Sequence, residues 1–142
     1  MRGLVRILVV ATTTLFCSCL APQNVEMVNV DAKSWDNAKS LAYDNSDTLS
    51  LRNLNIAIRY NDEFKQASLP LKIEVTTPDE RHFTDTVQLK LRHPNTALSV
   101  TTTESLPYRT SVQLNQKGRY TFAFEPLSQV QGVEAIGIEI KN

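Results

Sequence analysis

The sequence predicts an all-β domain, an antiparallel sandwich of about seven to eight strands of the jelly-roll or immunoglobulin-like kind. Apolar residues alternate with polar ones along most of the chain after Trp35, which is the period of half-buried strands. Turn-forming residues separate these stretches at roughly 10 to 15-residue intervals, and no stretch carries a sustained helical stripe. A small closed barrel is the alternative architecture. At 142 residues the chain has the length of one domain.

The chain begins with the pattern of a secretory signal peptide. Arg2 and Arg6 supply positive charge, and Ile7–Phe16 is an apolar stretch of ten residues that includes three threonines. Ten residues are too few to cross a bilayer, which takes about 20. Charge, a short apolar run and then small residues are typical of a cleaved signal, so residues 1–18 are set aside from the folded domain.

The two cysteines of the protein, Cys17 and Cys19, lie at the end of this segment. A bacterial lipoprotein signal places a small residue before the cysteine that receives the lipid. Ser18 precedes Cys19 and fits this rule, whereas the bulky Phe16 precedes Cys17. We therefore predict that Cys19 carries the lipid and anchors the protein to a membrane that the chain does not cross. An ordinary cleaved signal with two incidental cysteines is the alternative.

The residues that follow Cys19 have no clear period. Residues 20 to about 30 include Pro22, Gln23 and Asn24, and they are interpreted as a tether that holds the domain away from the lipid. The predicted organisation is a signal peptide over residues 1–18, the lipidated cysteine and tether over 19–34, and the β-sandwich over 35–142.

Seven alternating stretches predict the strands, of which the first two are the clearest. Their inward-facing residues are Leu54, Ile56, Ile58 and Tyr60; Leu69, Leu71, Ile73 and Val75; Val87, Leu89 and Leu91; Leu98 and Val100; Tyr108, Thr110, Val112 and Leu114; Tyr120, Phe122 and Phe124; and Ile136, Ile138 and Ile140.

Turn residues fall between these strands. Pro78 and Asp79 suit the centre of a type I turn, and Gly118 supplies a left-handed position before the next strand. Gly137 lies inside the last strand, where a glycine indicates a bulge or a close approach of another backbone.

The charge balance disfavours nucleic-acid binding. Lysine plus arginine and aspartate plus glutamate number 15 each. Removal of residues 1–18, which contain two arginines and no acid, leaves a net charge of −2. A surface of this kind has no basic excess with which to follow phosphates.

No constellation of catalytic or metal-binding residues is found, and no cofactor is expected. His82 and His93 are the two histidines, and both are interpreted as solvated loop residues. Asp44 to Asp47 offers oxygen ligands but lacks the glycine and the distal glutamate of a calcium loop, so a plain turn is favoured. We therefore expect neither an enzyme nor a small-molecule substrate.

Carbohydrate binding on a sandwich needs exposed aromatic platforms. Tyr60, Tyr108 and Tyr120 are in phase with aliphatic residues of their strands, which favours packing in the core. Tyr43 is a further candidate. Trp35 precedes the first clear strand, and a role as a cap on one end of the core is favoured over an exposed position.

Several short segments, taken in order, carry a resemblance to a known family. They are the lone Trp35, Asp47-Thr48, Asn53 to Asn61, Leu69 to Ile73, Thr77-Pro78-Asp79, Asp85-Thr86-Val87, Gly118 to Phe122 and Gly132 to Ile138. In this order and spacing the chain resembles the GldH gliding-motility lipoprotein family of the Bacteroidota. The resemblance covers most of the chain after the signal.

This resemblance implies a non-enzymatic cell-envelope lipoprotein linked to gliding motility and type IX secretion. We expect protein partners in the envelope and a membrane partner through the lipid on Cys19. Residues 20–24 hold no acidic cluster that would direct export to the cell surface, which favours a periplasm-facing position on the outer membrane. The alternative function is a surface lipoprotein that binds glycan through exposed aromatic side chains.

Overall fold

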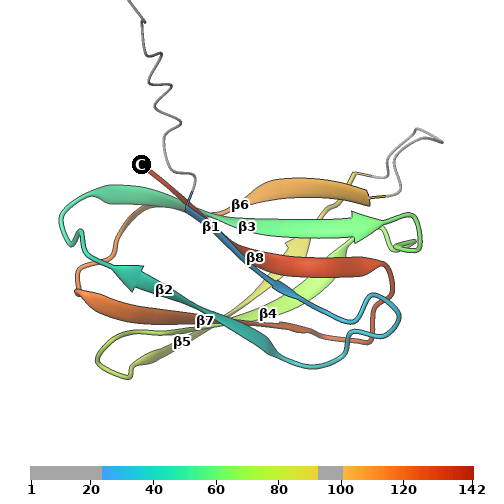
Figure 1. The fold of residues 1–142 in the computed structure, drawn as a ribbon, viewed down its shortest axis with the longest axis horizontal. Coiled ribbons are helices and arrows are strands. Elements are labelled where there is room, and N and C mark those ends of the chain that lie inside the picture. The colour runs from blue at the N-terminus through green and yellow to red at the C-terminus, as the bar shows by residue number, and fades with distance from the viewer. Residues whose placement is uncertain (1–23, 93–100) are drawn as a thin grey trace, which may run out of the picture.

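The computed structural model describes residues 24–92 and 101–142. They form eight strands and no helix, arranged as two stacked sheets (Figure 1). The strands are β1 (Asn24–Asn29), β2 (Lys39–Asn45), β3 (Leu51–Asn61), β4 (Leu69–Thr76), β5 (His82–Leu89), β6 (Thr101–Gln113), β7 (Gly118–Pro126) and β8 (Val133–Lys141). The predicted signal peptide, Cys17, Cys19, His93 and the strand expected at Leu98 and Val100 lie outside the described residues.

The strand order is that of a jelly roll. One sheet has the order β1-β8-β3-β6 and the other β2-β7-β4-β5, and every strand pair is antiparallel. Among strands consecutive in the chain, only β4 and β5 share a sheet. The predicted antiparallel sandwich is therefore confirmed, and of the two expected kinds the eight-stranded jelly roll is the one that forms.

The core lies between the two sheets and is built from the inward positions of the central strands. Strand β3 contributes Ile56, Ile58 and Tyr60, and strand β7 contributes Phe122 and Phe124, all of them buried. These residues alternate with more exposed ones, as the period-two pattern predicted. The inward phase predicted for β3, β4, β7 and β8 is confirmed.

Strand β6 departs from regular alternation. Thr110 was expected to face inward with Tyr108 and Val112, but it is exposed. The register with β3 shifts on both sides of Leu54, and Ser111 has a φ of 54°. The prediction at Thr110 is wrong because a bulge here rotates the side chains between the two flanking inward positions.

The predicted tether is wrong for residues 24–29, because these residues form β1. This strand pairs with β8 from Asn24 opposite Ile140 to Asn29 opposite Ala135. Asn24 and Glu26 of β1 lie on the same face of the sheet as Ile140, and both are exposed. An edge strand held by backbone hydrogen bonds needs no apolar alternation, so the period-two signal did not reveal it.

Strand β2 is the other strand that the alternation of the sequence does not predict. It pairs with β7 along its whole length and places Leu41 and Tyr43 against the core. It too is a sheet edge with exposed residues at alternate positions. Trp35 is 1% exposed and forms a bridge with Val130, so its expected role as a cap on the core is confirmed.

Candidate functional site

A cleft of about 400 Å³ opens between β5 and β6, at the end of the sandwich where β6 finishes and β5 starts. These two strands are edges of different sheets, so no strand pairing closes the sandwich between them. The inner wall of the cleft is apolar and includes Leu54, Val75 and Phe122. Phe83 lines the mouth and is 57% exposed. The cleft can therefore receive an apolar group of modest size.

An ionic and hydrogen-bonded group links the two edges across this cleft. Asp85 of β5 accepts a hydrogen bond from the Tyr108 hydroxyl at 2.9 Å and forms an ion pair with Arg109. The Arg109 guanidinium lies 5.4 Å from the centre of the Tyr108 ring. Hydrogen bonds from Arg109 and Tyr108 lower the pKa of Asp85, whereas burial, followed by its bond to Asp85, raises the pKa of Tyr108.

A second charged pair lies in the turn between β4 and β5. Arg81 Nε contacts Asp79 Oδ2 at 2.6 Å, and Thr77 donates a hydrogen bond to the same carboxylate. Hydrogen bonds from Thr77 and Gln116 lower the pKa of Asp79 to about 2. Each of the four charged side chains that line the described cleft thus has a partner of opposite sign within the lining. This balance favours an uncharged occupant over a charged one.

We predict that the carboxylate of Asp85 titrates below its ordinary value of 3.8 in the folded protein and that Arg109→Gln raises this pKa. A lowered folded-state pKa stabilises the fold above the unfolded value, and that contribution is lost as the pH falls through the folded value. Carbon-detected NMR titration of the side chain measures both midpoints. Arg119→Gln, which removes the exposed partner of Asp44 on β2, is the control. Equal Asp85 midpoints in wild type and Arg109→Gln would contradict the link.

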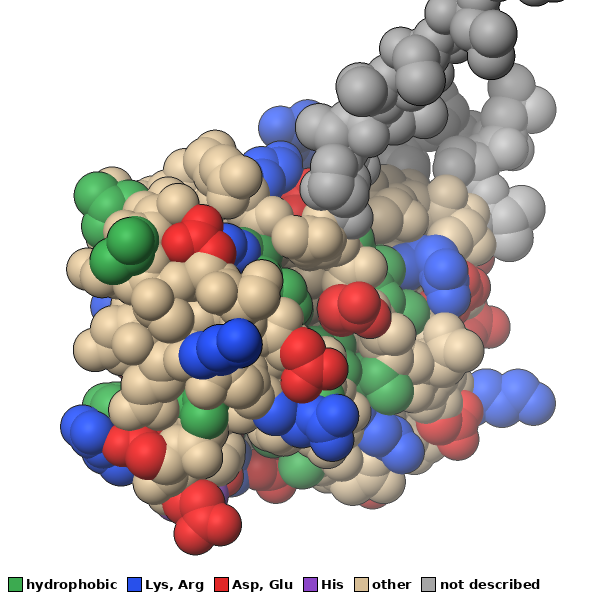
Figure 2. Space-filling model, turned by 60° about the vertical axis from the view of Figure 1, so that its left-hand side comes forward, with side chains coloured by type: hydrophobic (Ala, Val, Ile, Leu, Met, Phe, Trp, Pro, Cys, Tyr) green, Lys and Arg blue, Asp and Glu red, His purple; other side chains and the backbone are tan. Residues whose placement is uncertain are grey.

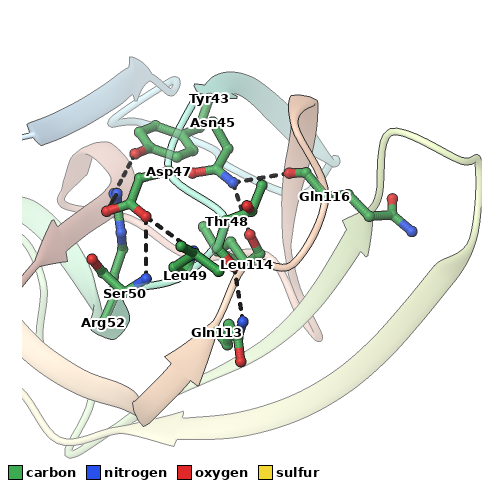
Figure 3. Close-up of polar contacts among 10 residues, drawn as sticks. All are labelled: Tyr43, Asn45, Asp47, Thr48, Leu49, Ser50, Arg52, Gln113, Leu114 and Gln116. Atoms are coloured by element: carbon green, nitrogen blue, oxygen red, sulfur yellow. Dashed lines mark hydrogen bonds and ion pairs between the residues drawn. The ribbon is translucent and has the colours of Figure 1, made fainter.

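A polar cluster next to the cleft shapes the end of the sandwich (Figure 3). The buried Asn45 amide donates hydrogen bonds to the carbonyls of Leu114 and Gln116, both at 2.9 Å. It thereby joins the end of β2 to the β6–β7 turn, which also lines the cleft. Gln113 donates from its side chain to the Thr48 carbonyl at 2.8 Å and ties the β2–β3 loop to β6.

The β2–β3 loop itself is built around Asp47. This carboxylate accepts hydrogen bonds from the backbone N–H groups of Leu49 and Ser50, at 3.0 and 3.1 Å. Arg52, which is 7% exposed, pairs with Asp47 at 3.2 Å and donates to the Tyr43 hydroxyl at 2.7 Å. The hydrogen bonds from Ser50 and Leu49 hold the pKa of Asp47 far below its ordinary range. The loop is therefore held in one shape by its own polar groups.

His82 is exposed, as expected, but it is the first residue of β5 and not a loop residue, and it lacks the geometry of a catalytic relay. Its Nδ1 lies 3.1 Å from the Thr76 hydroxyl and 3.3 Å from a carboxylate oxygen of Glu74. A base that activates a hydroxyl uses one ring nitrogen for the nucleophile and the other for the orienting carboxylate. Here both neighbours share one nitrogen.

The acidic residues at the end of β2 and in the β2–β3 loop form ion pairs with arginine side chains. Asp44 pairs with Arg119 at 3.2 Å, and Asp47 pairs with Arg52. Within residues 24–92 and 101–142 no cluster of three or more histidine, cysteine or acidic side chains is suited to hold a metal ion. The predicted turn is wrong for Asp44 and Asn45, which are the last two residues of β2, while Asp47 lies in the loop that follows.

The aromatic candidates for a glycan platform are turned into the protein. Trp35, Tyr60 and Tyr120 are buried, and Tyr43 and Tyr108 pack partly against the core. The exposed aromatic at the cleft mouth, Phe83, was not singled out from the sequence. The glycan-binding alternative therefore lacks the tyrosine and tryptophan platforms on which it was based.

The Asp85–Arg109 link was not predicted from the sequence pattern either. One signal of this link was present in the sequence. Asp85 lies two residues before Val87, at a position of the strand that faces inward, where a charged residue is unusual without a partner. Its partner lies 24 residues further along the chain and could not be paired with it from periodicity alone.

Comparison with known proteins gives one family. Residues 24–140 match the family described as GldH lipoprotein. The matched range runs from the first residue of β1 to Ile140, the residue before the end of β8. No curated protein matches the chain. The described strands and loops contain no helix long and apolar enough to cross a membrane.

Proposed function

Because the chain belongs to the GldH lipoprotein family, we propose that it is a lipid-anchored, non-enzymatic component of a bacterial envelope assembly linked to gliding motility or type IX secretion. The observation that carries this proposal is the extent of the family match. It runs through all eight strands of both sheets, so the family likeness concerns the domain as a whole and not one motif of it. The proposed position is the periplasmic face of the outer membrane.

The geometry supports a binding role over catalysis. The cleft presents an apolar wall with internally paired charges, and its polar neighbours hold loops in place. An apolar cleft between two unpaired edge strands suits a partner's side chain or an added strand. A reaction would need a nucleophile and an orienting carboxylate on different nitrogens of the base, whereas Thr76 and Glu74 both contact Nδ1 of His82.

The proposed anchor is Cys19. We predict that Cys19→Ala abolishes incorporation of radiolabelled palmitate, whereas Cys17→Ala is still labelled, because only Cys19 follows a small residue. Membrane fractionation of both variants checks the consequence for location. Labelling of Cys19→Ala together with loss of labelling in Cys17→Ala would show that the lipid is on the other cysteine.

The assembly role is tested by affinity purification of the tagged, lipidated protein from membranes of the native organism, with the Cys19→Ala variant as control. We expect motility or type IX secretion proteins to be recovered only with the lipidated form. Deletion of the gene should then impair colony spreading or secretion, and wild-type protein should restore it. Recovery of polysaccharide-utilisation proteins, or bound glycan with no such partner, would favour the glycan-binding alternative.

A further inference from the structure

We propose that the end of the sandwich nearest the lipid anchor is seated on the membrane, with Leu49 and Leu51 in contact with lipid. This inference rests on the proposed lipidation of Cys19 and concerns how the domain is oriented. The strand directions decide at which end of the sandwich the chain arrives from the anchor.

Strand β1 starts at the same end as the β2–β3 loop. Asn24 stands opposite Ile140 of β8, and Ile140 stands opposite Leu54 near the start of β3. The β4–β5 turn and the β6–β7 turn also lie at this end, on the left of Figure 1. We call it the anchor end. The β7–β8 connection, which contains Leu127, lies at the opposite end.

Exposed apolar side chains are concentrated at the anchor end. Leu49 is 83% exposed and Leu51 is 60% exposed. Val25 on β1 and Phe83 at the start of β5 are also exposed there, whereas the opposite end has Leu127 as its one large hydrophobic of this kind among the described residues. Figure 2 brings the anchor end forward and shows hydrophobic side chains standing out at its edge. Such clustering marks a contact with a membrane or a protein.

The short link to the anchor favours the membrane. Asn24 is five residues from Cys19, so the two are at most about 17 Å apart even if this link is fully extended. Leu51 lies three residues beyond the level of Leu54, about 10 Å further toward the anchor end. The β2–β3 loop extends past that point. It therefore reaches most or all of the way to the lipid surface that the acyl chains enter.

The loop is shaped for this contact before it meets lipid. The hydrogen bonds to Asp47 and the bond from Gln113 to the Thr48 carbonyl hold the backbone on both sides of Leu49 (Figure 3). Because the polar groups of the loop are bonded to one another, the leucine side chains can enter the interface without ordering a flexible segment. Residues seated in this way lie about 5–10 Å into the boundary between headgroups and acyl chains.

The test places a fluorescent probe at each end of the lipidated protein. Leu49→Cys, Leu51→Cys and Leu127→Cys each introduce one thiol, and the sequence has no cysteine after Cys19 to compete for the label. Leu127 is 56% exposed and is the matched control for Leu51. Each labelled protein is reconstituted in vesicles of phosphatidylethanolamine and phosphatidylglycerol that carry a nitroxide on the lipid headgroup or high on the acyl chain.

We expect the probes at positions 49 and 51 to be quenched about twofold or more above the probe at 127, with a blue-shifted emission. Equal quenching at both ends, in protein that floats with the vesicles, would overturn the orientation and leave the anchor intact. That result would point to a protein partner for the leucines. Failure of the wild-type lipoprotein to float with vesicles would overturn the proposed anchor and this inference together.

Discussion

Replacement of Phe122 by alanine is expected to lower the free energy of unfolding by about 3–5 kcal/mol, the usual effect of emptying a buried ring site. Phe122 is fully buried in the middle of β7, opposite Leu41 on one side and Val75 on the other. Its ring also forms part of the inner wall of the cleft. Truncation removes contacts with both sheets and extends the cleft into the core.

Chemical denaturation monitored by circular dichroism measures this loss. Phe83→Ala is the matched control, because this phenylalanine is 57% exposed at the cleft mouth and its removal should change the stability by no more than about 0.5 kcal/mol. A loss below about 1 kcal/mol in Phe122→Ala would show that the inward phase of β7 is wrong.

Gly137→Ala is expected to cost about 3 kcal/mol or more and to free β1 from the sheet. A Cβ atom at this position would lie 1.9 Å from the Glu26 carbonyl oxygen and 2.7 Å from the Met27 Cα. Both are backbone atoms of β1, so no side-chain rotation relieves the overlap. The strand would have to separate from β8 to accommodate one methyl group.

Hydrogen exchange distinguishes this local opening from general destabilisation. In Gly137→Ala the amides that β1 and β8 share should lose protection first, while those between β4 and β7 keep it in the folded protein. Ser40→Ala, an exposed change on the edge strand β2, is the control. Unchanged protection of β1 would contradict the close approach. Release of β1 would also lengthen the link from Cys19 to the sandwich and should weaken the quenching at position 49.

The central strands were predictable because their side chains alternate between a buried face and a more polar one. The burial of Tyr60, Phe122 and Ile138 is predicted by the alternation of apolar and more polar residues around each of them. The close approach at Gly137 and the capping role of Trp35 were predictable for a related reason, since a glycine within a strand and a large aromatic before one have few other uses. The anchor on Cys19 likewise stays a prediction from local sequence alone.

The sequence by itself determined the inward residues of the central strands β3, β4, β7 and β8, because burial leaves a local period in the chain. The tertiary structure decided the jelly-roll order, the pairing of the edge strands and the link from Asp85 to Arg109. Each of these depends on contacts between distant segments, and backbone pairing at an edge leaves little trace in side-chain pattern. The start of β1 at Asn24 had the largest consequence, because it leaves a link of only five residues to the proposed anchor at Cys19 and lies at the same end of the sandwich as the loop that carries Leu49.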